Sequence, residues 1–346
     1  MNLYLVEYFV IMLNVCLSHG LGYKAKKAIY IVTAIQLILI VILRSPRDEF
    51  WPDTENYLNT FKYFNSYVSF KQICTTGWEP GIVLLVKLIS IVSVDEQIYI
   101  VVLGLLILIP IFIMIWKECD FPILGLLVFY SMGYLFVTSI YRQWLAIAIL
   151  AWSLRYVYRR DLKKFLLFLL IAFIFHRTAI VFLGVYFLYN YRISGAKLIV
   201  AMISSAILGS TGRFVLMLTN RFARMQVVAQ NNGGYILLLV LWVCVLVSYF
   251  YMKMDMKNPK VRLPFNIVLF AAVIQPISFT FSLWSRIVIY FSMYLVLLLP
   301  QLISAIKSSI SNEGAWFVIE NAFMIVMLGW FIQSRTSTYI PFFELK

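Results

Sequence analysis

Long apolar runs separated by short polar segments recur from one end of the sequence to the other. A helix needs about 20 mainly apolar residues to cross a hydrocarbon core about 30 Å thick. The pattern predicts about twelve such spans, over residues 3–18, 27–43, 97–116, 121–139, 140–157, 163–176, 177–190, 197–209, 235–252, 263–280, 284–300 and 315–332. We therefore expect an all-α polytopic membrane protein.

One further apolar stretch, 79–94, is short, begins with Glu-Pro-Gly and carries Lys87. Such a stretch is typical of a re-entrant or interfacial helix. Short basic clusters mark cytoplasmic loops, and here they fall at residues 24–27, 155–164, 192–197 and 253–262. All four clusters share one side of the bilayer only if 79–94 does not cross it, which favours the re-entrant interpretation.

The composition changes this picture little. Hydrophobic residues make up 63% of the 346 positions and charged residues 13%, whereas soluble domains average about 25% charged residues. We expect a single membrane domain over 1–346, with amphipathic outer-face loops at about 44–78 and 210–234. The net charge of +14 is largely explained by the cytoplasmic Lys and Arg excess, so nucleic acid is not an expected partner.

Arginine and lysine are distributed unequally across the predicted topology. The outer side carries nine Arg and three Lys, and the inner side five Arg and eleven Lys. The guanidinium group grips phosphate oxygens in a bidentate fork, so an Arg-rich face indicates an anionic ligand. Candidates to bind it are Arg44, Arg177, Arg221 and Arg224. The alternative is that these side chains snorkel to lipid headgroups.

Three outward residues lie at the edge of a predicted span: Arg142, His176 and Arg286. Ionisable groups at membrane depth are costly and are functional candidates by default. His176 is one of two histidines and is either a general base or a packing residue hydrogen-bonded between helix ends.

The first outer loop combines carboxylates with aromatic rings, Asp53 and Tyr57 among them. Proteins hold sugars with such pairs, although an interfacial aromatic belt has the same composition. The segment 210–234 is either a mobile loop over the site or a plain connector. No P-loop, GxGxxG, HExxH or GxSxG motif is present, and His176 has no partner at ligand spacing, so neither nucleotide chemistry nor a metal is indicated.

Several segments together resemble a known family. Tyr-Arg-Gln-Trp-Leu-Ala-Ile-Ala at 141–148, Ser-Leu-Arg-Tyr-Val-Tyr-Arg-Arg at 153–160 and Ala-Phe-Ile-Phe-His-Arg-Thr-Ala at 172–179 resemble the central signature of the EpsG family of Wzy-type polysaccharide polymerases. Further matching residues are Asp53-Thr54 with Tyr57, Glu79-Pro80-Gly81, Arg286 and Tyr339. The serine common after the family histidine is replaced here by Arg177-Thr178.

The resemblance implies a glycosyltransferase that needs no cofactor, in the bacterial cytoplasmic membrane with its site facing the periplasm or cell exterior. Its substrates would be undecaprenyl-diphosphate-linked oligosaccharides, and a chain-length regulator would fit as a partner. Arg142, Arg286 and His176 would be catalytic, with His176 taking the acceptor's proton or holding the acceptor. Asp53, Tyr57, Glu79 and Tyr339 would hold the substrate, unless Asp53 or Glu79 serves as the base instead. Two alternatives stay open: an O-antigen-ligase-like transferase, and a flippase or transporter for the same lipids.

Overall fold

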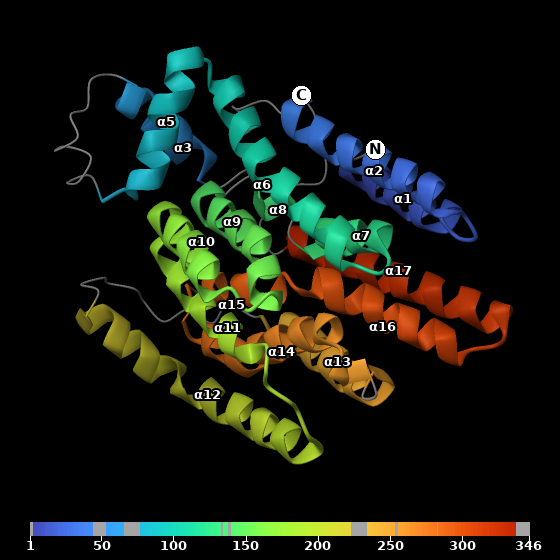
Figure 1. Cartoon of the computed structure of the whole chain (residues 1–346). Helices are drawn as coiled ribbons and strands as arrows, with labels where there is room; N and C mark the ends of the chain where they lie inside the picture. The colour runs from blue at the N-terminus through green and yellow to red at the C-terminus, as the bar shows by residue number, and fades with distance from the viewer. Residues whose placement is uncertain are drawn as a thin grey trace. The chain divides into compact units, whose positions relative to one another are not determined.

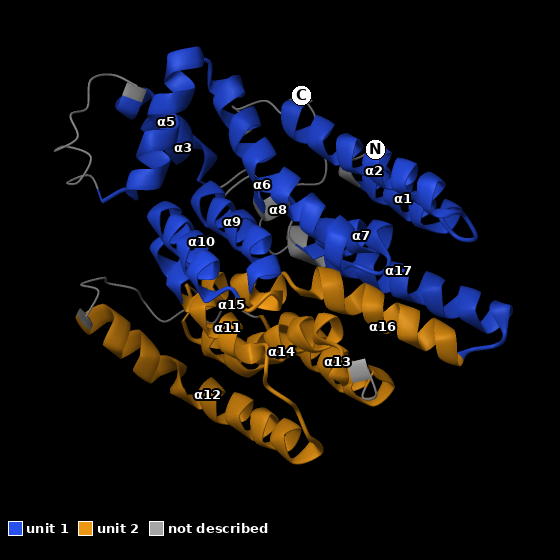
Figure 2. Cartoon of the chain, viewed as in Figure 1, with its two compact units in different colours: residues 1–156, 161–180, 310–346 blue, residues 157–160, 181–309 orange. Residues whose placement is uncertain are grey.

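The computed structural model describes residues 3–43, 53–65, 77–132, 134–137, 140–222, 234–252, 255–281 and 283–336, and these residues form helices and connecting turns with no strand among them (Figure 1). The all-α expectation is confirmed. Contacts divide the chain into two compact units, coloured in Figure 2. Unit 1 comprises 1–156, 161–180 and 310–346, and unit 2 comprises 157–160 and 181–309.

The described residues include six helices long and apolar enough to cross a membrane, or seven if the bent pair Trp284–Ser292 and Leu295–Ser309 is one span. These helices indicate a multi-pass membrane protein, but about twelve spans are not confirmed. The longest helical stretches in the apolar segments 121–139, 163–176 and 177–190 have 11, 14 and 12 residues, respectively, the last made of a 3-10 turn that continues into α11. At 1.5 Å per residue these reach about 21 Å at most, short of a hydrocarbon core about 30 Å thick.

Unit 1 is organised around α7 (Pro122–Met132), in which every residue from Ile123 to Ser131 is buried. A helix that is apolar all round, as this one is, belongs in the interior of a bundle. Its neighbours are α1 (Leu3–Leu17), α2 (Tyr23–Leu43), α6 (Glu96–Glu118) and α17 (Glu313–Thr336). The Tyr8 hydroxyl donates to the Met324 carbonyl at 2.6 Å, so the first and last helices of the chain are joined within this unit.

The remaining helices of unit 1 include the ones that carry the candidate site. They are α3 (Thr54–Asn65), α5 (Pro80–Val92), α8 (Tyr134–Val137), α9 (Tyr141–Tyr158, in unit 1 up to residue 156) and α10 (Leu162–Phe175). Helix α5 packs against α3, α6 and α10. Its 13 residues agree with the short helix expected at 79–94.

Unit 2 is built around α14 (Pro259–Ile274), of which twelve residues are buried. Around it lie α11 (Gly184–Leu188), α12 (Gly195–Phe222), α13 (Tyr235–Met252), α15 (Trp284–Ser292) and α16 (Leu295–Ser309), with 3-10 turns at Asp255–Lys257 and Gln275–Phe279. A third 3-10 turn, Arg177–Leu183, begins in unit 1 and ends in unit 2. Helix α12 continues to residue 222, so the expected loop at 210–234 is helical in its first half. The close approach of Gly212 to Thr280 holds this extension against the rest of the unit.

The two units carry very different charge. Residues assigned to unit 2 include thirteen Lys and Arg but one Asp, a net +12, whereas unit 1 has sixteen basic and fourteen acidic residues, a net +2. All five ion pairs among the described residues lie in unit 1. In unit 2, buried Arg262 donates to the carbonyls of Tyr189, Met256 and Lys257, and Arg160 donates to the Tyr186 carbonyl and covers the Tyr186 ring at 3.8 Å.

Candidate active site

Glu79 stands where extended chain turns into helix α5. Its backbone is extended, Pro80 occupies the first helical turn, and its side chain does not cap the helix, so the carboxylate is available for other partners. Two residues on, Gly81 lies against α10. A Cβ at Gly81 would come within 2.9 Å of the Ile174 carbonyl oxygen, so only glycine allows this close approach. The Glu-Pro-Gly sequence thereby brings the start of α5 against the end of α10.

His176 lies at the break where α10 ends. Its backbone is extended, its N–H donates to Ala172, and its carbonyl accepts from Ala179 at the start of a 3-10 turn. The break directs the imidazole away from the helix axis toward Glu79. The side chain is 14% exposed, so solvent still reaches it.

The Glu79 carboxylate holds two partners, one on each oxygen. Oε2 accepts from Arg142 Nη1 at 2.6 Å, and Oε1 lies 3.1 Å from His176 Nδ1. Arg142 belongs to the first turn of α9 and His176 follows α10, so residues 63 and 97 positions from Glu79 meet on one group. Glu79 is 7% exposed and Arg142 is 27% exposed.

The environment keeps Glu79 ionised. Burial by itself would raise the pKa of its carboxyl, but the hydrogen bond with His176 and the charge of Arg142 outweigh burial and lower the pKa to about 2. An ionised carboxylate only accepts hydrogen bonds, so Nδ1 of His176 must carry the proton that the two groups share. In the neutral ring, Nε2 is then the basic nitrogen.

Aromatic side chains surround the charged group. The Arg142 guanidinium lies 4.3 Å from the centre of the Trp78 ring, within range of a cation–π interaction. The Tyr57 hydroxyl accepts from the Arg142 backbone N–H at 3.3 Å, and the Tyr57 ring meets Trp78 and Tyr141 edge to face. Trp78 and Tyr141 were not among the predicted residues, although each directly precedes one that was.

The structure thus brings together four predicted residues, Tyr57, Glu79, Arg142 and His176. Asp53 lies just before α3, in left-handed backbone with φ of 74°, and accepts from the Tyr57 N–H through its carbonyl. Arg177 follows His176 with its side chain exposed.

The other predicted residues are elsewhere. Arg286 and Arg221 belong to unit 2, at the start of α15 and the end of α12, and both are exposed. Arg44, Arg224 and Tyr339 lie outside the described residues. Across the described part of the chain, no three His, Cys, Asp or Glu side chains gather as metal ligands.

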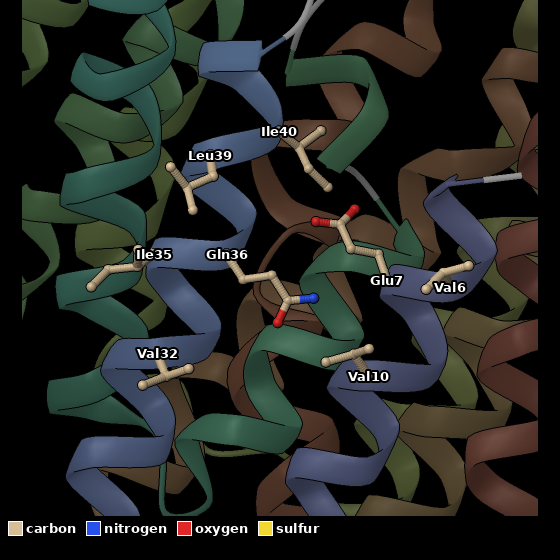
Figure 3. Close-up of a pocket in the computed structure, with 8 residues that line it drawn as sticks. All are labelled: Val6, Glu7, Val10, Val32, Ile35, Gln36, Leu39 and Ile40. Atoms are coloured by element: carbon tan, nitrogen blue, oxygen red, sulfur yellow. The ribbon is translucent and has the colours of Figure 1, made fainter. Parts of the chain in front are cut away.

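A separate cavity of about 480 Å³ lies between α1 and α2 (Figure 3). Its lining is mainly Val, Ile and Leu, with Glu7 and Gln36 as the polar members. Glu7 is buried and accepts from the Tyr130 hydroxyl at 2.8 Å. None of the predicted site residues lines this cavity.

Fold and site together define a class: a multi-pass helical membrane protein with a buried carboxylate that joins an arginine to a histidine. Comparison of the sequence with known families assigns the chain to one family within this class. The chain belongs to the EpsG family, whose sequence model matches residues 28–343, nearly the whole chain. No curated protein and no solved structure matches the chain. Family and apolar helices together indicate a membrane protein of polysaccharide biosynthesis.

Proposed function

We propose that the protein is a polymerase that joins undecaprenyl-diphosphate-linked oligosaccharide repeat units into a surface polysaccharide. It acts on the outer face of the bacterial cytoplasmic membrane as a glycosyltransferase whose donor glycan is carried on a polyprenyl diphosphate. Membership of the EpsG family, which is associated with Wzy-type polymerases, supports the reaction class. The donor carries its own leaving group, so the reaction needs no nucleotide and no cofactor.

One observation carries this proposal: Glu79 holds Arg142 and His176 together, at 2.6 and 3.1 Å. Transfer from a lipid diphosphate needs a cation where negative charge grows on the leaving group and a base where the acceptor hydroxyl loses its proton. Arg142 supplies the permanent charge in the bidentate form that suits phosphate. His176 supplies a basic Nε2.

The transfer balances with these two residues. The sugar hydroxyl of the incoming lipid-linked unit attacks the anomeric carbon of the growing glycan and forms a new glycosidic bond. The bond from that carbon to the diphosphate breaks, and undecaprenyl diphosphate leaves with its charge stabilised by Arg142. The hydroxyl proton passes to His176 Nε2 and then to solvent.

The remaining predicted residues have supporting roles in this proposal. As the family resemblance implies, Arg286 is a cation for the anionic substrate, and Arg44, Arg177, Arg221 and Arg224 attract the anionic headgroup from the outer surface. Asp53, Tyr57 and Tyr339 bind sugar hydroxyls. The bilayer supplies both lipid-linked substrates, and a chain-length regulator is the expected protein partner.

The test is the surface-glycan ladder of a deletion strain complemented with wild type or with Arg142→Ala, His176→Ala or Arg286→Ala. We expect deletion to reduce the ladder to single repeat units and the three variants to leave it so at normal membrane abundance. Arg192→Ala, which removes an exposed arginine of unit 2, is the matched control and should restore the ladder.

Two outcomes would overturn the proposal. Long chains that persist on undecaprenyl diphosphate after deletion would place the protein after polymerisation, as a ligase-like transferase. Full ladders from both Arg142→Ala and His176→Ala would remove the site even if the polymerase assignment stood.

A further inference from the structure

The Glu79 carboxylate contacts both Arg142, which in the proposed function stabilises the leaving diphosphate, and His176, which takes the proton of the acceptor. It is nearly inaccessible, and each of its oxygens already has a protein partner. A carboxyl with a pKa of about 2 is also a weak base, because a proton acceptor works best when its pKa is near the working pH. Glu79 therefore neither binds sugar hydroxyls nor takes the acceptor's proton.

The contact with His176 has a definite chemical consequence. Because Glu79 accepts the Nδ1 proton, the neutral ring is fixed as the Nδ1–H tautomer, which leaves Nε2 unprotonated. The same contact stabilises the imidazolium that forms once Nε2 takes a proton. Any change that strengthens the hold of Glu79 on His176 makes the histidine a stronger base.

The contact with Arg142 is the one that can change. Of the five N–H donors of a guanidinium, Arg142 uses Nη1 on Glu79, and its buried Nε has no hydrogen-bond partner among the described residues. The side chain is 27% exposed and the guanidinium lies 4.3 Å from the centre of the Trp78 ring. It can therefore rotate away from Glu79 while it keeps its contact with that ring. A diphosphate carries more negative charge than one carboxylate and competes with Glu79 for the same cation.

We propose that Glu79 is a positioning residue shared between Arg142 and His176, and that the donor's diphosphate draws Arg142 away so that Glu79 then acts on His176 alone. Donor binding thereby prepares the base for the acceptor hydroxyl, and the base is weaker until the donor is present. This inference rests on the proposed function, since it takes the diphosphate as the ligand of Arg142.

Few groups enter this exchange. The charged side chains of the site are Glu79 ahead of α5, Arg142 in α9 and Arg177 next to His176, with Asp53 acting on Tyr57. The phenols near them are those of Tyr57 from α3, Tyr99 from α6 and Tyr141 from α9. Arg177 directly follows His176 and, by the proposed function, attracts the same diphosphate. Its effect on His176 does not pass through Glu79 and therefore persists in the Glu79→Gln variant described below.

The chain has only two histidines, so ¹⁵N spectra of the ring nitrogens in the full-length His19→Gln protein report His176 alone. The protein is held in nanodiscs of a zwitterionic lipid and titrated with pH, with and without undecaprenyl diphosphate. Without the lipid we expect the Nδ1–H tautomer. With it we expect the proton affinity of Nε2 to rise about tenfold, because Glu79 then acts on the ring alone.

Glu79→Gln is the decisive variant because it keeps the size of the side chain and removes its charge. It should lose the tautomer preference and most of the rise, whereas a direct effect of the diphosphate on His176 would persist in it. An Nε2–H tautomer in the parent protein, or an equal rise in Glu79→Gln, overturns the inference. The glycan ladder tests the proposed function separately. A protein that makes polymer but shows no rise in proton affinity refutes this inference alone. A protein that shows the rise but makes no polymer refutes the polymerase assignment.

Discussion

The contact between Gly81 and Ile174 makes Gly81→Ala a sharp test of how the site is built. The added Cβ would lie 2.9 Å from the Ile174 carbonyl oxygen and 3.0 Å from its carbonyl carbon. Backbone atoms cannot turn aside as the end of a side chain can. Helices α5 and α10 must therefore separate at the point where they carry Glu79 and His176.

The size of the effect follows from these distances. Ordinary contact begins at 3.4 Å, so the helices move apart by about half an ångström. The 3.1 Å contact between Glu79 and His176 then lengthens to about 3.6 Å, at which a side-chain hydrogen bond is lost. Overpacking costs about 1–3 kcal/mol, and a hydrogen bond to a charged group contributes about 1.5–3 kcal/mol. We expect a loss on the order of 3 kcal/mol in stability and a roughly tenfold loss of polymer yield.

The measurements are the thermal unfolding midpoint of purified protein and the glycan ladder at matched abundance. Gly329→Ala in α17 is the control, because a Cβ there has nothing within 4 Å and alanine favours a helix over glycine by about 1 kcal/mol. It should be neutral or stabilising. Wild-type stability together with a wild-type ladder in Gly81→Ala would refute the close approach of α5 and α10.

Three further predictions concern the same cluster. Arg142→Lys keeps the charge but loses the planar fork, so we expect polymer yield to fall by about tenfold or more; a full ladder would show that a point charge suffices. Because the folded pKa of Glu79 is about 2 against an ordinary 4.5, its ionised form stabilises the fold above pH 4.5, and this contribution, no more than about 3 kcal/mol, is lost as the pH falls toward 2. Unfolding midpoints from pH 6 to 3 should therefore fall more steeply in wild type than in Glu79→Gln, and equal slopes would contradict the pKa. Tyr57→Phe removes the acceptor of the Arg142 N–H and should cost about 1 kcal/mol of stability, which an unchanged melting curve would disprove.

The sequence predicts the helical class and the position of most apolar segments, because periodicity and hydropathy are local properties. It does not predict how far each helix extends. The stretch 121–139 reads as one span, yet α7 ends at Met132, and 197–209 reads as a short span, yet α12 runs to Phe222. The length of a helix depends on its packing partners, which are distant in sequence, as Thr280 is from Gly212 of α12.

The candidate site was predictable in its members but not in its geometry. Family resemblance and membrane depth single out Arg142 and His176, and Glu79 lies in a short motif before an apolar helix. Glu79 can contact both Arg142 and His176 because α10 ends just before His176 and because Gly81 has no side chain. A hydropathy pattern reports neither feature. Trp78 was missed because tryptophan in an outer loop is ordinary at membrane interfaces.

The uneven distribution of carboxylates gives the two units different responses to acid. Every ion pair in the described residues belongs to unit 1 and weakens when its carboxylate takes up a proton. Two arginines of unit 2, Arg160 and Arg262, rest instead on carbonyl oxygens and, for Arg160, on a tyrosine ring, none of which titrates between neutral and acid pH. Acidification therefore weakens ion pairs of unit 1, where Glu79, Arg142 and His176 lie, and leaves the contacts of Arg160 and Arg262 intact.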